Sequence, residues 1–112
     1  MARLIGPNRA RQLCLSGERL KAEEARNWGI VNAIFPQSEL LQRAEEMILK
    51  IAANSPFAVA QAKRALNEGL ETDMDHALLF EQTLFGLCFS TEDCREGAKA
   101  FQEKRKPHFT GK

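Results

Sequence analysis

The side chains best suited to nucleophilic or metal chemistry are few in this chain. Its two histidines, His76 and His108, have no serine or carboxylate at a spacing typical of an assembled nucleophile and base. Its three cysteines, Cys14, Cys88 and Cys94, show no C-x-x-C spacing. A closed zinc site needs four ligands, and the separations of these five residues match no such pattern. The sequence therefore predicts surface histidines, free thiols and no metal site.

Acidic residues could act as general acid and base if two of them converged on one substrate atom. The pairs Glu23-Glu24 and Glu45-Glu46 fall in predicted helices, where neighbouring side chains point about 100° apart, so we interpret them as solvated. Glu81 differs, because it falls inside the apolar arc of its predicted helix, where a carboxylate must be paired or lose its charge. We favour a structural pair with an Arg or Lys across an interface, since no second carboxylate or nucleophile is placed to work with Glu81.

A basic cluster lies near the end of the chain. Residues 95–112 hold six cations against two acids, a local charge of +4, whereas the whole chain carries +1. Such a cluster can be a solvated surface, or it can seat a phosphorylated ligand with an aromatic ring, because Phe101 and Phe109 are interleaved with it. Composition leaves both readings open. The six cations are Arg95, Lys99, Lys104, Arg105, Lys106 and Lys112.

The composition argues against several kinds of binding partner and cellular compartment. The chain has 112 residues with 16 Lys+Arg and 15 Asp+Glu, so no bulk charge favours nucleic acid or anionic lipid, and RNA binding through the tail is disfavoured. We expect no membrane span and no secretion signal, because apolar stretches are short. An odd number of cysteines agrees with a reducing compartment, either the cytoplasm or, in a eukaryote, the mitochondrial matrix.

The apolar periodicity predicts a mainly helical domain. Asn8, Ser55, either Thr72 or Asp73, and either Ser90 or Thr91 are the expected N-caps, and Gly29 is the expected left-handed residue after a helix. The β-branched and aromatic run 30–35 is the one candidate strand. Five or six helices are expected over residues 9–15, 22–28, 38–51, 56–70, 74–89 and 92–106.

The predicted helix 74–89 has the broadest apolar surface. Steps of about 100° per residue place its apolar side chains on an arc of roughly 200°. One neighbouring layer does not cover such an arc, so the helix must be central or lie at a subunit interface, and we favour the interface.

Several motifs together resemble one known family. Segment 15–25 (LSGERLKAEEA), segment 28–32 (WGIVN), segment 90–97 (STEDCREG) and segment 100–107 (AFQEKRKP) are similar to sequences of the enoyl-CoA hydratases, the crotonase family. The resemblance runs from Arg3 to the end of the chain. Hydratases, isomerases and related acyl-CoA enzymes share these segments.

The resemblance implies a place in a larger fold. Crotonases have a spiral α/β core followed by helices that pack into trimers, often paired into hexamers. This chain resembles the helical C-terminal part of that fold, with its trimerisation helices and at most one short strand. We expect residues 1–54 to be the last part of the core and residues 55–112 to be a helical oligomerisation region.

The resemblance also implies a function. The complete enzymes hydrate 2-enoyl-CoA thioesters in fatty acid metabolism, without a tightly bound cofactor. Two glutamates and two oxyanion-binding N–H groups do this chemistry, and the family places all of them upstream of the segment matching Arg3. We therefore expect no catalytic residue in this chain and no activity of the chain alone.

Phe85 and Lys104 match the aromatic and basic residues that hold the adenine and phosphate end of coenzyme A. The alternative is a stand-alone helical interaction module without enzymatic activity.

Overall fold

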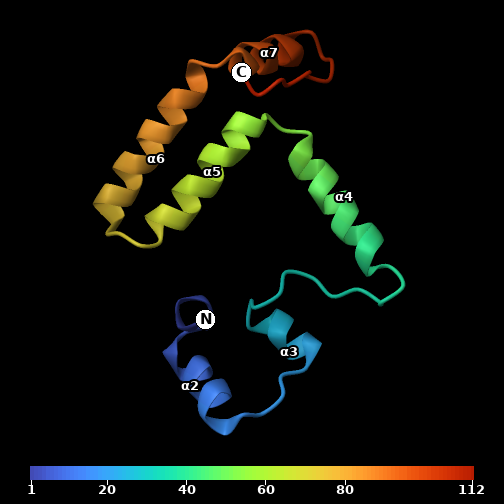
Figure 1. Ribbon diagram of the computed structural model, residues 1–112, viewed down its shortest axis with the longest axis vertical. Helices are drawn as coiled ribbons and strands as arrows, with labels where there is room; N and C mark the ends of the chain where they lie inside the picture. Colours follow the sequence, from blue (N-terminus) through green and yellow to red (C-terminus); the bar gives the residue numbers. More distant parts are fainter. The chain divides into compact units, whose positions relative to one another are not determined.

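The computed structural model describes all 112 residues, and every regular element in it is a helix (Figure 1). The prediction of a mainly helical chain is confirmed, with one more helix than expected. The chain divides into two compact units, Met1–Arg43 and Ala44–Lys112. The helices are α1 (Ala2–Ile5), α2 (Pro7–Ser16), α3 (Ala22–Asn27), α4 (Leu40–Ala52), α5 (Pro56–Gly69), α6 (Met74–Phe89) and α7 (Glu92–Gln102).

In the first unit, α2 begins earlier than the sequence indicated. Pro7 is its first residue and Gly6 its N-cap, so Asn8 lies inside the helix and the predicted Asn8 cap is wrong. Proline suits this place, because its fixed φ is already helical and its missing N–H would have no partner there. The helix ends at Ser16, and Gly17 is its C-cap in the left-handed conformation (φ 66°). The Arg9 guanidinium then stacks over the Trp28 ring at 5.5 Å.

The predicted strand over residues 30–35 does not form. After α3, Gly29 adopts φ 77°, its amide donates to the Arg26 carbonyl (3.0 Å), and the Ile30 amide donates to the Ala25 carbonyl (2.9 Å). This is the two-bond helix end that a left-handed glycine permits, so the role predicted for Gly29 is confirmed. A β-branched run becomes a strand only when another strand pairs with it, and this chain contains none.

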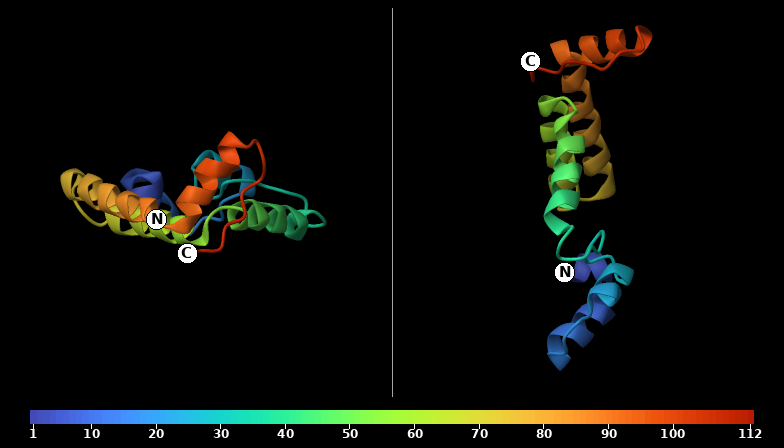
Figure 2. Two further views of the ribbon diagram at one scale, coloured as in Figure 1. Left: turned by 90° about the horizontal axis from the view of Figure 1, so that it is seen from above. Right: turned by 90° about the vertical axis from the view of Figure 1, so that its right-hand side faces the viewer.

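In the second unit, α5 and α6 run side by side, joined by a short turn (Figures 1 and 2). The three predicted N-caps are confirmed: Ser55 accepts from the Ala58 amide, Asp73 from the His76 amide and Thr91 from the Cys94 amide. Each cap satisfies an amide that no helical carbonyl can reach.

The core of the second unit is small. Only Leu84 and Ala100 are buried apolar side chains there, whereas large apolar side chains on α4 and α6 remain exposed, among them Ile48 at 63% and Phe85 at 64%. The helices therefore present apolar faces that their own unit does not cover, and faces of this kind mark interaction surfaces. None of the helices has the length and apolar character needed to cross a lipid bilayer.

Candidate functional site

Lys104 stands at the most unusual backbone position of the chain. It is the one residue other than glycine with a positive φ, at 53°. The Lys104 amide donates to the Phe101 carbonyl (3.3 Å) and the Arg105 amide to the Ala100 carbonyl (3.0 Å), which closes the end of α7. The helix therefore ends at Gln102 and not near Pro107 as predicted. Glycine is the usual residue here, because a Cβ crowds the backbone in this conformation.

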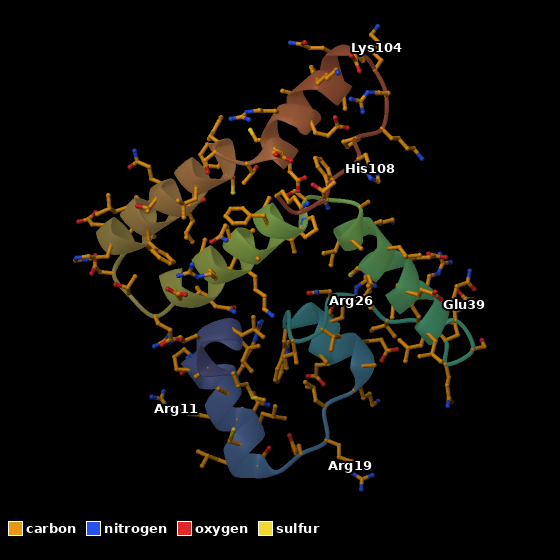
Figure 3. The ribbon with its side chains drawn as sticks, turned by 45° about the horizontal axis from the view of Figure 1, so that its top comes forward. Arg11, Arg19, Arg26, Glu39, Lys104 and His108 are labelled. Atoms are coloured by element: carbon orange, nitrogen blue, oxygen red, sulfur yellow. The ribbon has the colours of Figure 1, made fainter.

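Two aromatic residues flank this turn, and they have different roles. Phe101, one turn before Lys104, is 86% exposed. Phe109 is half-buried and covers Gly97, where a Cβ would lie 3.6 Å from its ring. The tail thus uses Phe109 for packing and leaves Phe101 exposed. Lys104 lies at the outer end of α7 (Figure 3).

Arg105 is not a free cation of the basic cluster. Its Nη1 and Nη2 donate to the two carboxylate oxygens of Glu96 at 2.6 and 2.9 Å, and its Nε donates to Glu103 at 2.6 Å. Glu96 also accepts the His108 amide at 2.8 Å. The hydrogen bonds from Arg105 and then from the His108 amide lower the pKa of Glu96 to about 2. The sequence pattern did not reveal this pair, because its partners are separated by nine residues and a change of chain direction.

Asp93 fastens the end of the tail. The side chain is 2% exposed and accepts from the Ser55 hydroxyl (2.6 Å), the Thr110 amide (2.8 Å) and the Gly111 amide (3.0 Å). Burial raises the pKa of Asp93, but these hydrogen bonds outweigh burial and leave the pKa below its usual value. The tail therefore returns along α7 and is held at two points, at Glu96 and at Asp93 (Figures 1 and 3).

The two residues predicted to contact coenzyme A are separate in this chain. Phe85 lies on α6, where its ring meets the Phe89 ring edge-on at a centroid distance of 5.0 Å. Lys104 follows α7, and eleven helical residues at about 1.5 Å each place it roughly 16 Å beyond the start of that helix. The aromatic side chain and the cation therefore come from different elements, one on α6 and the other after the last residue of α7.

Glu81 is exposed and lies in an apolar groove between α5 and α6. A cavity of about 300 Å³ is lined there by Glu81 and the small or apolar side chains of Ala62, Ala65 and Leu84. Glu81 makes no hydrogen bond or ion pair within the chain, so the predicted pairing across an interface stays a prediction. Within one copy Glu81 is exposed, because α5 covers only one side of α6.

The remaining candidates for chemistry are scattered. His76 is exposed, as predicted, and its Nδ1 lies 2.6 Å from Asp73, the N-cap of its own helix. The three cysteines are unpaired, with Cys14 exposed and Cys88 and Cys94 half-buried. In the described chain, no group of three histidine, cysteine or acidic side chains could hold a metal ion.

Comparison with known proteins identifies the relatives of this chain. The model of the enoyl-CoA hydratase/isomerase family matches residues 1–112. The short-chain-enoyl-CoA hydratase of Clostridium acetobutylicum is 45% identical over 106 residues, which are 95% of this chain and 41% of that protein. The crotonyl-CoA hydratase of Syntrophomonas wolfei is 41% identical over all of this chain and 43% of that protein.

A solved structure agrees with these relatives. The enoyl-CoA hydratase of Bacillus anthracis matches 99% of this chain and 43% of its own, with a TM-score of 0.96 and 39% identity. This chain therefore spans less than half the length of the relatives it matches, and its helices are those of a crotonase-fold hydratase. The comparisons do not favour the alternative of a stand-alone interaction module. Because the family model matches the whole chain, the chain belongs to the enoyl-CoA hydratase/isomerase family.

Proposed function

We propose that this chain is the C-terminal part of an enoyl-CoA hydratase that adds water to 2-enoyl-CoA thioesters in fatty acid metabolism. The observation that carries the proposal is the similarity of the whole chain to hydratases, at 45% and 41% identity in two of them. Those two relatives are named for short-chain enoyl-CoA and for crotonyl-CoA, so a short 2-enoyl-CoA is the first substrate to test.

The role of the chain in this proposal is to bind the nucleotide end of coenzyme A, with no tightly bound cofactor. Lys104 supports it, because an exposed lysine is kept where glycine would be less strained. Its ammonium would hold a phosphate as a point charge, and the exposed ring of Phe85 would cover the adenine. Since the two residues lie apart in one copy, we propose that different subunits supply them to one site.

Assembly is the second role. We propose that residues 55–112 form the oligomerisation region of a trimer or hexamer and that residues 1–54 complete the core. The exposed apolar side chains of α6 support this arrangement, since an uncovered arc of that kind needs a second layer. The proposed compartment is the cytoplasm, or the mitochondrial matrix if the organism is a eukaryote.

The chemical step needs groups other than those described above. Hydration needs an acid–base pair and an oxyanion site, which each contribute factors of about 10² or more. Glu81 has no second carboxylate beside it, and the carboxylates of Asp93 and Glu96 are occupied by hydrogen bonds. We therefore expect no hydratase activity from these 112 residues alone.

A chimera tests the proposal. The 106 matched residues of the Clostridium acetobutylicum hydratase would be replaced by the corresponding residues of this chain, and the loss of the conjugated enoyl-thioester absorbance would be followed. We expect a kcat within about tenfold of the parent enzyme, and a raised KM in the Lys104→Ala chimera because a phosphate contact is lost. A folded chimera of native size with no activity would overturn the proposal.

A further inference from the structure

We infer that Glu96 and Arg105 are positioning residues for Lys104, and that their ion pair sets the preference of the coenzyme A site for a ligand carrying the 3′-phosphate. The inference rests on the proposed function, because it deepens the role of Lys104 in that site. It assigns no contact between coenzyme A and either positioning residue.

The conformation of Lys104 needs external support. A positive φ is unfavourable for a residue with a Cβ, and such a residue persists only when the surrounding structure enforces its conformation. Two backbone hydrogen bonds, of 3.3 and 3.0 Å, close the turn around Lys104. Many helices end with these bonds around a glycine, so the bonds alone do not explain why a lysine is held there.

Arg105 supplies the missing support from both sides of the turn. Its Nε donates to Glu103, so the two neighbours of Lys104 are bonded to each other. Its two terminal nitrogens bind Glu96, two helical turns earlier on α7, and Glu96 in turn binds the His108 amide. The Glu96 carboxylate therefore ties Arg105 and His108 to α7, and Arg105 in turn holds Glu103. This leaves Lys104 at the apex, with its side chain toward solvent.

The same ion pair determines which charges an incoming phosphate meets. The Arg105 guanidinium is shared between Glu96 and Glu103 and is not available to a ligand. Both carboxylates, in turn, are bonded to Arg105. Lys104 and the exposed Lys106 remain as the cations of the turn. Recognition would then depend on where the Lys104 ammonium is held, and less on the total charge of the tail.

The Glu96→Gln variant tests whether the position of Lys104 or the total charge of the tail governs binding, because the two predict opposite changes in affinity. Glu96→Gln removes one negative charge and frees a guanidinium, so an account based on charge alone predicts tighter binding of the more highly charged ligand. Positioning predicts the reverse, because Lys104 is no longer held at the apex. The matched control is Glu92→Gln, which makes the same charge change at an exposed position of α7 outside the ion pair.

The experiment uses the full 112-residue chain labelled with ¹⁵N. Dissociation constants for coenzyme A and 3′-dephospho-coenzyme A would be measured from amide shifts, and the HN–Hα coupling of Lys104 would report its φ. We expect the wild type and Glu92→Gln to prefer coenzyme A about fivefold, and Lys104→Ala to show no preference. Glu96→Gln should also lose the preference, and its Lys104 coupling should leave the left-handed value. If that variant does not fold, Arg105→Lys tests the same point, since it keeps the charge and loses the two-pronged contact.

Failure of the positioning role and failure of the proposed Lys104 contact give different results. A wild-type preference that is lost in Lys104→Ala and kept in a folded Glu96→Gln or Arg105→Lys variant would overturn the positioning role and leave the proposed function standing. A wild type without any preference would overturn the proposed Lys104 contact, and the positioning role with it.

Discussion

The α5–α6 pair and the α7–tail region are stabilised by different interactions. The α7–tail region contains the two most buried residues of the molecule, Ala100 and Asp93, and its tail is bonded back to the α7 carboxylates of Asp93 and Glu96. The α5–α6 pair buries only Leu84 and leaves Leu78, Leu79 and Phe85 more than half exposed. A polar network satisfies itself within one chain, whereas an apolar face is stabilised only when another surface covers it. Apart from the exposed Phe101, the first region is held together within one chain, and we expect the second region to need a partner surface.

The largest expected effect is on assembly through α6. We expect the chain to self-associate, and Leu79→Asp to weaken that association by a factor of about 10 to 100, because burying a leucine contributes about 1.5–3 kcal/mol. Sedimentation velocity over a range of concentrations measures the effect. Gln82→Asp is the matched control, since it adds the same charge to the same helix and removes no apolar surface. A well-folded wild type that stays monomeric at high concentration would contradict the need for a partner surface.

The next effect concerns the fastening of the tail. Asp93→Ala leaves the Thr110 and Gly111 amides without their acceptor, so we expect these amides to exchange with solvent at least about tenfold faster. Hydrogen exchange followed by NMR measures this, with Asp75→Ala at an exposed position of α6 as the control. Unchanged protection of both amides in the Asp93 variant would show that the tail is held by apolar packing instead.

A smaller and reversible effect is expected in acid. The pKa of Glu96 in the folded chain is about 2, below its usual value of 4.5, so the folded state favours the ionised form. Its stabilising contribution is complete above pH 4.5 and is lost as the pH falls toward 2. Between these values the His108 amide, which binds Glu96, should lose protection first. If Glu96→Gln shows the same acid-induced loss at His108, Glu96 is not its cause.

The smallest effect is expected at Lys104 itself. Lys104→Gly should stabilise α7 and the tail by about 0.5–1 kcal/mol, because glycine adopts a positive φ without a steric penalty. The same variant should bind coenzyme A more weakly, because it lacks the ammonium. A gain in stability together with a loss of affinity would show that the strained lysine serves binding and not folding. Urea unfolding measures the first quantity and NMR titration the second. Lys106→Gly is the control for loss of charge, and a Lys104→Gly chain that is less stable than the wild type would contradict the strain argument.

Local signals in the sequence were reliable where one residue decides a structure. Ser55, Asp73 and Thr91 are N-caps, and Gly29 ends a helix, because each choice depends on a bond within three to five residues. The Asn8 cap failed for a local reason, because Pro7 begins the helix. The other errors arose where a partner outside the segment decides the structure. The run 30–35 has strand-like composition and no strand to pair with. The last helix was predicted too long because the Arg105–Glu96 ion pair, which holds the turn after Gln102, joins residues nine positions apart.

The sequence by itself thus determined the helical character of the chain, most of its helix ends and the family it belongs to, because these follow from short-range periodicity and from motifs. Only the tertiary structure decided how the basic cluster is used. It joined Arg105 to Glu96 and the tail amides to Asp93, and it left Lys104 as an exposed cation in a left-handed turn. The physical reason is that a charge acquires its role from the groups that surround it in space. Nine to thirty-eight residues separate those groups in the Arg105–Glu96 and Ser55–Asp93 pairs.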